Sequence, residues 1–325
     1  MNRTIYMTYK HNVPENVLAR WKSINKDYHI ELSLDTDCID FLRTHFNENI
    51  VALFKNLKKG MHKADLWRLC KLYIHGGVYA DADLVPYIDV SALDSNVTFY
   101  SCLSTDPNSV FQAFMVVSKP KSPLLLHYLI SFLLNNPSHE SYFSRKCFHE
   151  EKCRCPTHDM YKCILQNVNH KIEPDKPYAF DEIKIRIHVG PSTSSMKMIN
   201  LLYFPKDISY TIMGPNRFTF FIQGDTLTIR NKSGTGWTED LQCYICIKSH
   251  EVLLLFPEHG EEGWASSYVS HKGTKILDCR DPIYIQNKGW NARRPLNKKK
   301  VFLFVFLLVQ FLYLIPLFLS VQEWY

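Results

Sequence analysis

The first fifty residues switch between short apolar runs and segments whose apolar residues recur every three or four positions. Strands are predicted over residues 4–8 and 29–34, and helices over residues 17–21 and 39–46. This order of strand, helix, strand and helix predicts a parallel sheet, in which ligands bind at the carboxyl ends of the strands. We therefore expect an α/β fold with its site at that edge.

Residues 64–83 repeat this arrangement in a more specific form. Apolar side chains from Leu66 to Tyr73 recur at helical spacing, which predicts an amphipathic helix. Gly76–Gly77 ends the helix, because glycine adopts the positive φ that a helix C-terminus requires. The helix should then be followed at once by a short strand.

Two aspartates follow the short apolar strand at residues 78–80. Because side chains alternate along a strand, Asp81 and Asp83 are expected to point the same way. Paired carboxylates suit Mn²⁺ or Mg²⁺, which retain coordination positions for water and phosphate. Asp65 and Arg68 lie three residues apart on one helix face, from which they can approach the same cleft. We expect this pair to serve a ligand and to contribute little to stability.

The ordered string A-D-x-x-R, G-G-x-Y-x-D-x-D resembles the DXD sugar transferases of glycosyltransferase family 32. That family includes yeast-type initiating α-1,6-mannosyltransferases and inositol phosphoceramide mannosyltransferases. The string is also similar to the catalytic core of the large clostridial glucosylating toxins. The resemblance implies an α/β fold of the GT-A type, a nucleotide-sugar donor, Mn²⁺ or Mg²⁺, and transfer with retention of anomeric configuration.

The resemblance also implies roles for individual residues. Catalytic roles are expected for Asp65, Arg68 and Asp83. The metal ligands are expected to be Asp81, Asp83 and His271. The donor-binding residues are expected to be Thr8, Tyr9, Asp35, Asp65, Arg68, Tyr79, Gln112, Gly190 and Lys275.

Three of these assignments rest on stretches later in the chain. Gln112 stands where similar enzymes carry an asparagine, so it keeps the amide but lengthens the side chain. Gly190 precedes a proline and the serine-rich stretch 192–195, which predicts a helix start with backbone N–H groups open to an anion. His271 and Lys275 lie in a stretch similar to the family's C-terminal His-x-x-Gly-Ser-Trp segment.

The rest of the chain predicts additions to a catalytic domain over residues 1–210. An insertion at 137–163 is rich in cysteine and histidine; it is expected to be a reduced loop, with a zinc site as the alternative. Residues 211–290 read as a module of short strands and hairpins that completes or packs on the catalytic domain. Residues 291–300 read as a basic linker.

Residues 301–321 form a run of twenty-one residues without a charge. As a helix this run spans roughly 31 Å, the thickness of a bilayer core. The basic residues before it predict a C-terminal tail anchor with the catalytic domain on the cytoplasmic side. No signal peptide is recognised at the N-terminus, and ten cysteines then favour reduced thiols. The formal net charge of +6 reflects this membrane flank more than a nucleic-acid site.

The sequence thus favours a membrane-anchored transferase acting on a lipid, glycan or protein acceptor. Two alternatives stay open. Two aspartates and a metal also serve phosphoryl chemistry, so a metal-dependent phosphotransferase or nuclease is one rival. A non-catalytic, tail-anchored binding protein that keeps the fold is the other.

Overall fold

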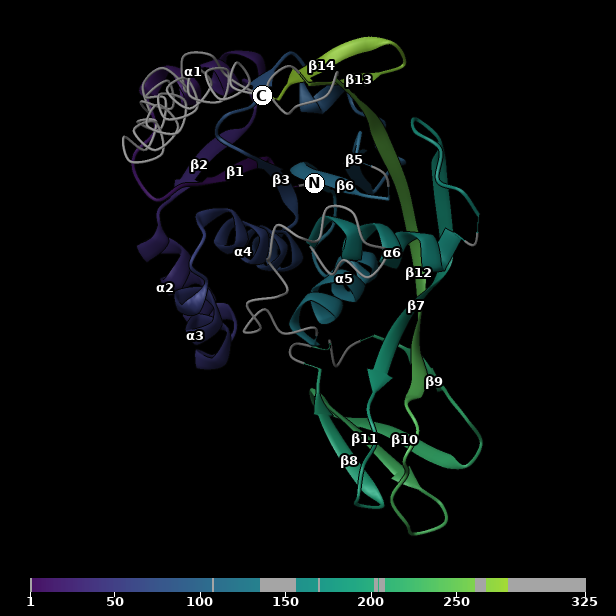
Figure 1. Cartoon of the computed structure of the whole chain (residues 1–325). Helices are drawn as coiled ribbons and strands as arrows, with labels where there is room; N and C mark the ends of the chain where they lie inside the picture. The colour runs from purple at the N-terminus through teal and green to yellow at the C-terminus, as the bar shows by residue number, and fades with distance from the viewer. Residues whose placement is uncertain are drawn as a thin grey trace, which may run out of the picture. The chain divides into compact units, whose positions relative to one another are not determined.

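The structure, a computed structural model, describes residues 2–106, 108–134, 156–168, 170–201, 204, 208–260 and 267–279. All of them lie in one compact unit, Met1–Asp281. Figure 1 shows its elements in chain order. They are β1 (Thr4–Thr8), α1 (Glu15–Ile24), β2 (His29–Ser33), α2 (Asp35–His45), α3 (Glu48–Asn56), α4 (Gly60–His75), β3 (Gly77–Ala80), β4 (Val85–Pro86), η1 (Val90–Ala92), β5 (Phe99–Leu103), β6 (Val110–Val117), α5 (Pro123–Leu134), α6 (Pro156–Val168), β7 (Pro177–Val189), β8 (Met196–Asn200), β9 (Tyr210–Met213), β10 (Phe218–Gln223), β11 (Thr226–Asn231), β12 (Leu241–His259), β13 (Tyr268–His271) and β14 (Thr274–Asp278).

A central sheet runs in the order β2-β1-β3-β6-β5-β12-β13-β14-β4. β1 pairs in parallel with both β2 and β3, and β5 pairs in parallel with β12. β6 is antiparallel to both of its neighbours, β3 and β5. The predicted α/β class is confirmed, but the prediction of a parallel sheet holds only for these pairs. β5 and β6 are joined without a crossover helix, so β6 returns against the parallel direction.

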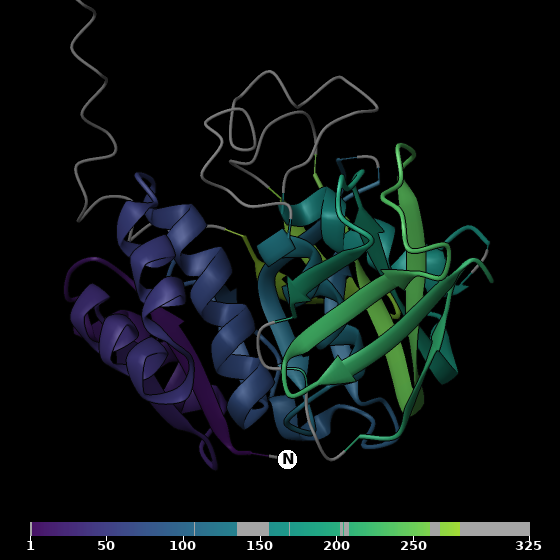
Figure 2. The same cartoon turned by 90° about the horizontal axis from the view of Figure 1, so that it is seen from below.

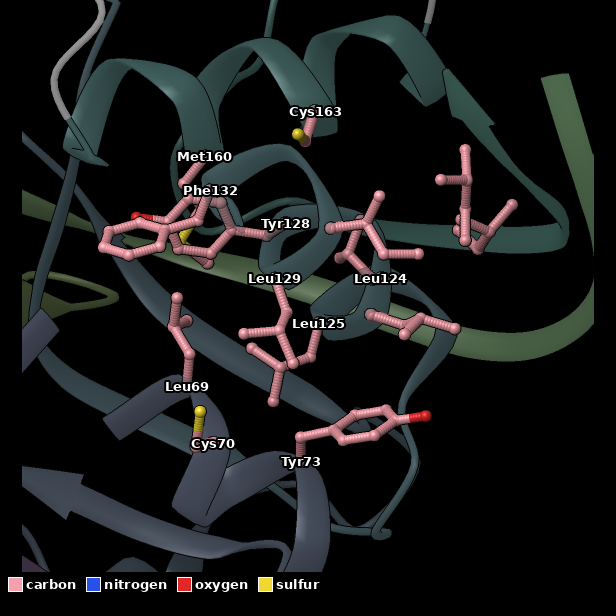
Figure 3. Packing of buried hydrophobic residues seen from close by; sticks show 14 of the residues in the cluster. Leu69, Cys70, Tyr73, Leu124, Leu125, Tyr128, Leu129, Phe132, Met160 and Cys163 are labelled. Atoms are coloured by element: carbon pink, nitrogen blue, oxygen red, sulfur yellow. The ribbon is translucent and has the colours of Figure 1, made fainter. Parts of the chain in front are cut away.

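Helices cover both faces of this sheet. On one face, Met115 and Val117 of β6 belong to the large core formed with α4, α5 and α6. Figure 3 shows this packing, with Leu69 of α4, Leu129 of α5 and Cys163 of α6 among the side chains in it. Side chains alternate along a strand, so Phe114 faces the other way, where its ring stacks on Trp21 of α1. Burial on both faces explains why these strands are almost wholly apolar.

β12 is a single strand of nineteen residues. Residues 211–290 were predicted to contain only short strands, and this was wrong for β12. Residues 248–251 include no glycine, proline or asparagine, and the chain passes through them with only an irregularity between Lys248 and Glu251. β12 pairs with β5, β7, β9 and β13, so strands on both sides of residue 210 share one sheet.

A second sheet of three strands runs in the order β10-β11-β8 (Figure 2). The predicted hairpin of β10 and β11 is confirmed. The helix predicted to start at residues 192–195 was wrong, because these residues form turns that lead into β8. The hydroxyls of Ser192 and Ser194 accept hydrogen bonds from backbone N–H groups two residues on, which competes with helix formation.

Several predictions fall on parts of the chain outside the described residues. They include the basic linker 291–300, the apolar segment 301–321 and most of the insertion 137–163. Within the described part, no helix is both long and apolar enough to cross a membrane. The boundary between a catalytic domain and an added module stays a prediction.

Candidate active site

The reversal of the chain between α4 and β3 builds the site. Gly76 and Gly77 have φ angles of +62° and +96°, as predicted for a glycine stop. A Cβ at Gly76 would stand 2.9 Å from the carbonyl oxygen of Val117, so both the turn and the close approach to β6 require glycine. The reversal places the first half of α4 beside Asp81, which directly follows β3.

Arg68 of α4 is the centre of this arrangement. Its Nη2 lies 3.2 Å from Oδ1 of Asp65 and 3.4 Å from Oδ1 of Asp81. Its Nη1 donates to the carbonyl oxygen of Gln112, and its Nε donates to that of Ala64. Only 5% of the Arg68 side chain is exposed. The predicted Asp65–Arg68 pair therefore exists, but it is a buried pair, and the expectation of little effect on stability loses its basis.

Tyr79 of β3 contacts both Arg68 and Asp81. Its ring lies 4.3 Å from the guanidinium carbon of Arg68, and its hydroxyl donates to Oδ1 of Asp81 at 2.5 Å. The residue is fully buried, so it presents no surface to a donor. Burial raises the pKa of the Asp81 carboxyl, and Arg68 and the Tyr79 hydroxyl act in the opposite direction.

Asp81 and Asp83 lie in the turn after β3 and not on the strand itself. Leu84 donates its N–H to the carbonyl oxygen of Asp81 at 3.1 Å, which closes the turn. Both aspartates are partly exposed, whereas Ala82 between them is buried. The alternation from which the two carboxylates were predicted to point the same way does not apply, because they lie beyond the end of the strand.

Gln112 of β6 also contacts Arg68 of α4. It is 2% exposed, and its Nε2 donates to the hydroxyl of Tyr128 on α5 at 2.7 Å. Gln112 therefore reaches Arg68 through its main-chain oxygen, while its side chain faces the α5 core. Tyr128 was not predicted, because no local pattern links a residue of an apolar helix to Gln112 on the preceding strand.

The predicted residues of β1 and α2 lie at the same edge of the sheet. Thr8 Oγ1 donates to the carbonyl oxygen of Ser33, which fixes it at the end of β1. Tyr9 follows Thr8, and its N–H donates to the same oxygen. Asp35 begins α2, and its Oδ2 accepts from Lys63 of α4 at 2.6 Å. Lys63 was not singled out by sequence reasoning, although it lies only two residues before Asp65.

The remaining predicted residues make other contacts. Gly190 follows β7, and its carbonyl oxygen accepts from Lys197. Without a helix after it, the argument for an anion site there fails. His271 Nδ1 lies 2.8 Å from Asp175 Oδ1, and Lys275 Nζ lies 2.8 Å from Asp278 Oδ1. The roles of His271 and Lys275 toward a metal and a donor stay predictions.

Within the described residues, no group of three His, Cys, Asp or Glu side chains is suited to hold a metal ion. Asp81 and Asp83 still supply two partly exposed carboxylates on one turn. Mg²⁺ and Mn²⁺ accept such hard oxygen ligands, and Mg²⁺ commonly uses one or two carboxylates together with water and substrate phosphates. The residues present therefore fit an ion whose remaining ligands come from water and a diphosphate.

His62 was also missed by the sequence analysis. Its Nδ1 lies 3.6 Å from Asp65 Oδ2, one helical turn away, and its side chain is 12% exposed. The three-residue spacing on α4 was a signal that could have found it.

Comparison with known proteins finds a family profile that matches part of the chain. Residues 13–100 match the profile described as "Glycosyltransferase sugar-binding region containing DXD motif". The resemblance to DXD glycosyltransferases is confirmed. The matched residues contain Asp65, Arg68, Tyr79, Asp81 and Asp83, the residues of the centre described above.

Other comparisons add less. No curated protein matches the sequence. Among solved structures, the chain is similar to "PaToxG Glycosyltransferase" with 14% identity and a TM-score of 0.37, covering 52% of this chain and 70% of that one. That likeness is too weak to carry an argument about mechanism. The match to the DXD sugar-binding region supports sugar transfer as the activity class.

Proposed function

We propose that the chain is a metal-dependent glycosyltransferase of the GT-A type. It transfers a sugar, with retention, from a nucleotide-sugar donor such as a UDP-sugar or GDP-mannose to a lipid, glycan or protein acceptor. The observation that carries the proposal is the contact of Arg68 with both Asp65 and Asp81 inside the matched sugar-binding region.

Each residue of this centre has a distinct task in the proposed reaction. Asp81 and Asp83 would hold Mn²⁺ or Mg²⁺ against the donor diphosphate. When bound, the ion supplies positive charge that stabilises the departing nucleoside diphosphate. Asp65 would accept hydrogen bonds from donor-sugar hydroxyls and so orient the anomeric carbon. Arg68 holds both carboxylates in place, and it makes most of its contacts with the protein.

Retention follows from the resemblance and is part of the proposal. Attack on the same face of the sugar from which the diphosphate leaves requires no enzymatic carboxylate nucleophile. The acceptor hydroxyl would lose its proton to the departing diphosphate, which is the nearest new base on that face. The chain's contribution is to fix the donor so that these two groups meet.

A donor screen without an acceptor tests the proposal. The full chain is incubated with a panel of UDP-sugars and GDP-mannose, with Mn²⁺ or EDTA, and release of nucleoside diphosphate and free sugar is measured. Many sugar transferases transfer slowly to water, so we expect Mn²⁺-dependent release from one donor class and loss of release in Asp83→Asn. Cleavage of phosphodiesters or transfer of a phosphoryl group would support the rival enzyme class. Donor binding without turnover, also in the presence of cell-extract acceptors, would support a binding protein.

A further inference from the structure

The two oxygens of the Asp81 carboxylate are not equivalent. Oδ1 accepts from the Tyr79 hydroxyl at 2.5 Å and lies 3.4 Å from Arg68 Nη2. The Tyr79 hydrogen bond and the Arg68 ion pair therefore both fall on Oδ1. Among the described residues, no hydrogen bond or ion pair reaches Oδ2. Since 32% of the side chain is exposed, Oδ2 is the oxygen left for a ligand.

The donors on Oδ1 are themselves fixed. Arg68 has five N–H groups, and one each from Nε and Nη1 is directed at the carbonyl oxygens of Ala64 and Gln112. Nη2 faces Asp65 and Asp81. Each of the three guanidinium nitrogens therefore has a protein partner, in a side chain that is 5% exposed. Arg68 has almost no surface with which to touch a sugar.

Tyr79 is fixed in the same way. It lies on β3 with no exposed surface, and its ring packs against the guanidinium of Arg68. The hydroxyl can reach Oδ1 only from the protein side of the carboxylate. The Tyr79 hydroxyl and the Arg68 guanidinium therefore both restrain the Oδ1 side of the Asp81 carboxylate.

We infer that Arg68 and Tyr79 are positioning residues that commit Oδ1 of Asp81 to the protein, so that Asp81 binds a divalent cation through Oδ2 alone. The inference rests on the proposed function for the identity of the ligand. It assigns to Arg68 and Tyr79 a role other than direct donor contact.

The test compares Tyr79→Phe with a matched control in the full chain. Tyr100 of β5 also buries most of its ring in the central sheet, and its hydroxyl donates to the carbonyl oxygen of Asp94 at 2.8 Å, away from the site. Tyr100→Phe therefore removes a comparable hydrogen bond without touching Asp81. Mn²⁺ affinity is measured by electron paramagnetic resonance titration without any donor, and melting temperature is recorded for each variant.

Loss of a hydrogen-bond partner behind a metal ligand weakens metal affinity by about 10–100-fold. We expect Tyr79→Phe to weaken Mn²⁺ binding by about tenfold, with Tyr100→Phe remaining within about twofold of the wild type. Tyr79→Phe should lose more thermal stability than Tyr100→Phe, because a hydrogen bond to a carboxylate contributes more than one to a neutral carbonyl. Arg68→Lys, which keeps the charge but lacks the fork to Asp65 and Asp81, should weaken Mn²⁺ binding as well if it folds.

An unchanged or tighter Mn²⁺ affinity in Tyr79→Phe would overturn the inference, as would a wild-type chain that binds no Mn²⁺. The proposed function fails by a different result. A wild-type chain that binds Mn²⁺ but turns over no nucleotide sugar would refute sugar transfer, while the comparison of the two tyrosine variants would still decide the role of Tyr79.

Discussion

Replacing Arg68 by methionine should destabilise the protein strongly. The substitution keeps an unbranched apolar stem but removes the guanidinium group, including its contact with the Tyr79 ring. It removes the partner of Asp65 and Asp81, and it leaves the carbonyl oxygens of Ala64 and Gln112 without their donor. Removing one member of a buried ion pair costs about 3–5 kcal/mol, because the other charge stays buried and unpaired.

The magnitude translates into a measurable shift. For a unit of this size, 1 kcal/mol corresponds to about 2–4 °C in melting temperature, so we expect a decrease of about 10 °C. Thermal unfolding followed by circular dichroism measures it. Arg43→Met is the matched control, since Arg43 pairs with Asp40 and Glu48 on the surface and its side chain is 46% exposed. Surface pairs of this kind contribute about 0–1 kcal/mol.

The result that refutes the reasoning is equally specific. If Arg68→Met melted within about 2 °C of the wild type, as Arg43→Met should, the Arg68 contacts would be screened by water, and the buried centre described above would not exist. Partial protonation of Asp81 in the variant would reduce the loss, because burial raises the pKa of this carboxyl. Repeating the measurement at pH 8 and pH 5 separates this effect, since the loss should be larger at the higher pH.

Three further predictions can be tested on the same protein. Asp83→Asn should abolish Mn²⁺-dependent release of nucleoside diphosphate while changing the melting temperature by less than about 3 °C, since a partly exposed turn residue contributes little packing. Full activity of this variant with Mn²⁺ would show that Asp83 does not bind the ion. Burial lowers the pKa of His127 to about 3, against about 6.5 in the unfolded chain, so the unfolded state binds the extra proton and stability falls as pH decreases below 6.5, by up to about 1.4 kcal/mol per pH unit. The melting temperature of His127→Gln should therefore decrease less between pH 7 and pH 5 than that of the wild type. Equal decreases would contradict this. If residues 301–321 insert as a tail anchor, protease added to sealed microsomes should digest the N-terminal part and Asn96 should carry no glycan, whereas a protected and glycosylated domain would reverse the topology.

The elements of the site could be predicted because their signals are local. The helical spacing up to Tyr73, the glycine stop and the two aspartates lie within twenty residues, and the structure places α4, β3 and the turn accordingly. The strand at residues 4–8 was likewise predicted from a short local apolar run, and β1 has the same bounds.

What could not be predicted depends on contacts between distant residues. The burial of Arg68 follows from β6 and α5 packing against α4, and neither Gln112 nor Tyr128 carries a pattern that points to Arg68. The serines at 192–195 have the composition of a helix start, but pairing of the next residues with β11 decides their conformation. Tertiary context overrides a local preference of that kind.

The parallel pairing of β5 with β12 has a consequence for the order in which the chain can fold. Phe99 is in register with Leu253, so the contact closes a loop of 154 residues. Pairings of such sequence separation slow folding, because chain entropy is lost before the contact is gained. The sugar-binding match ends at residue 100, within β5. During synthesis that strand therefore keeps one open edge until the ribosome has released residues 253–257, and such an edge is the part of a nascent sheet most prone to pair with other chains. Although the recognised segment contains the aspartates, its sheet is completed only by strands from far beyond it.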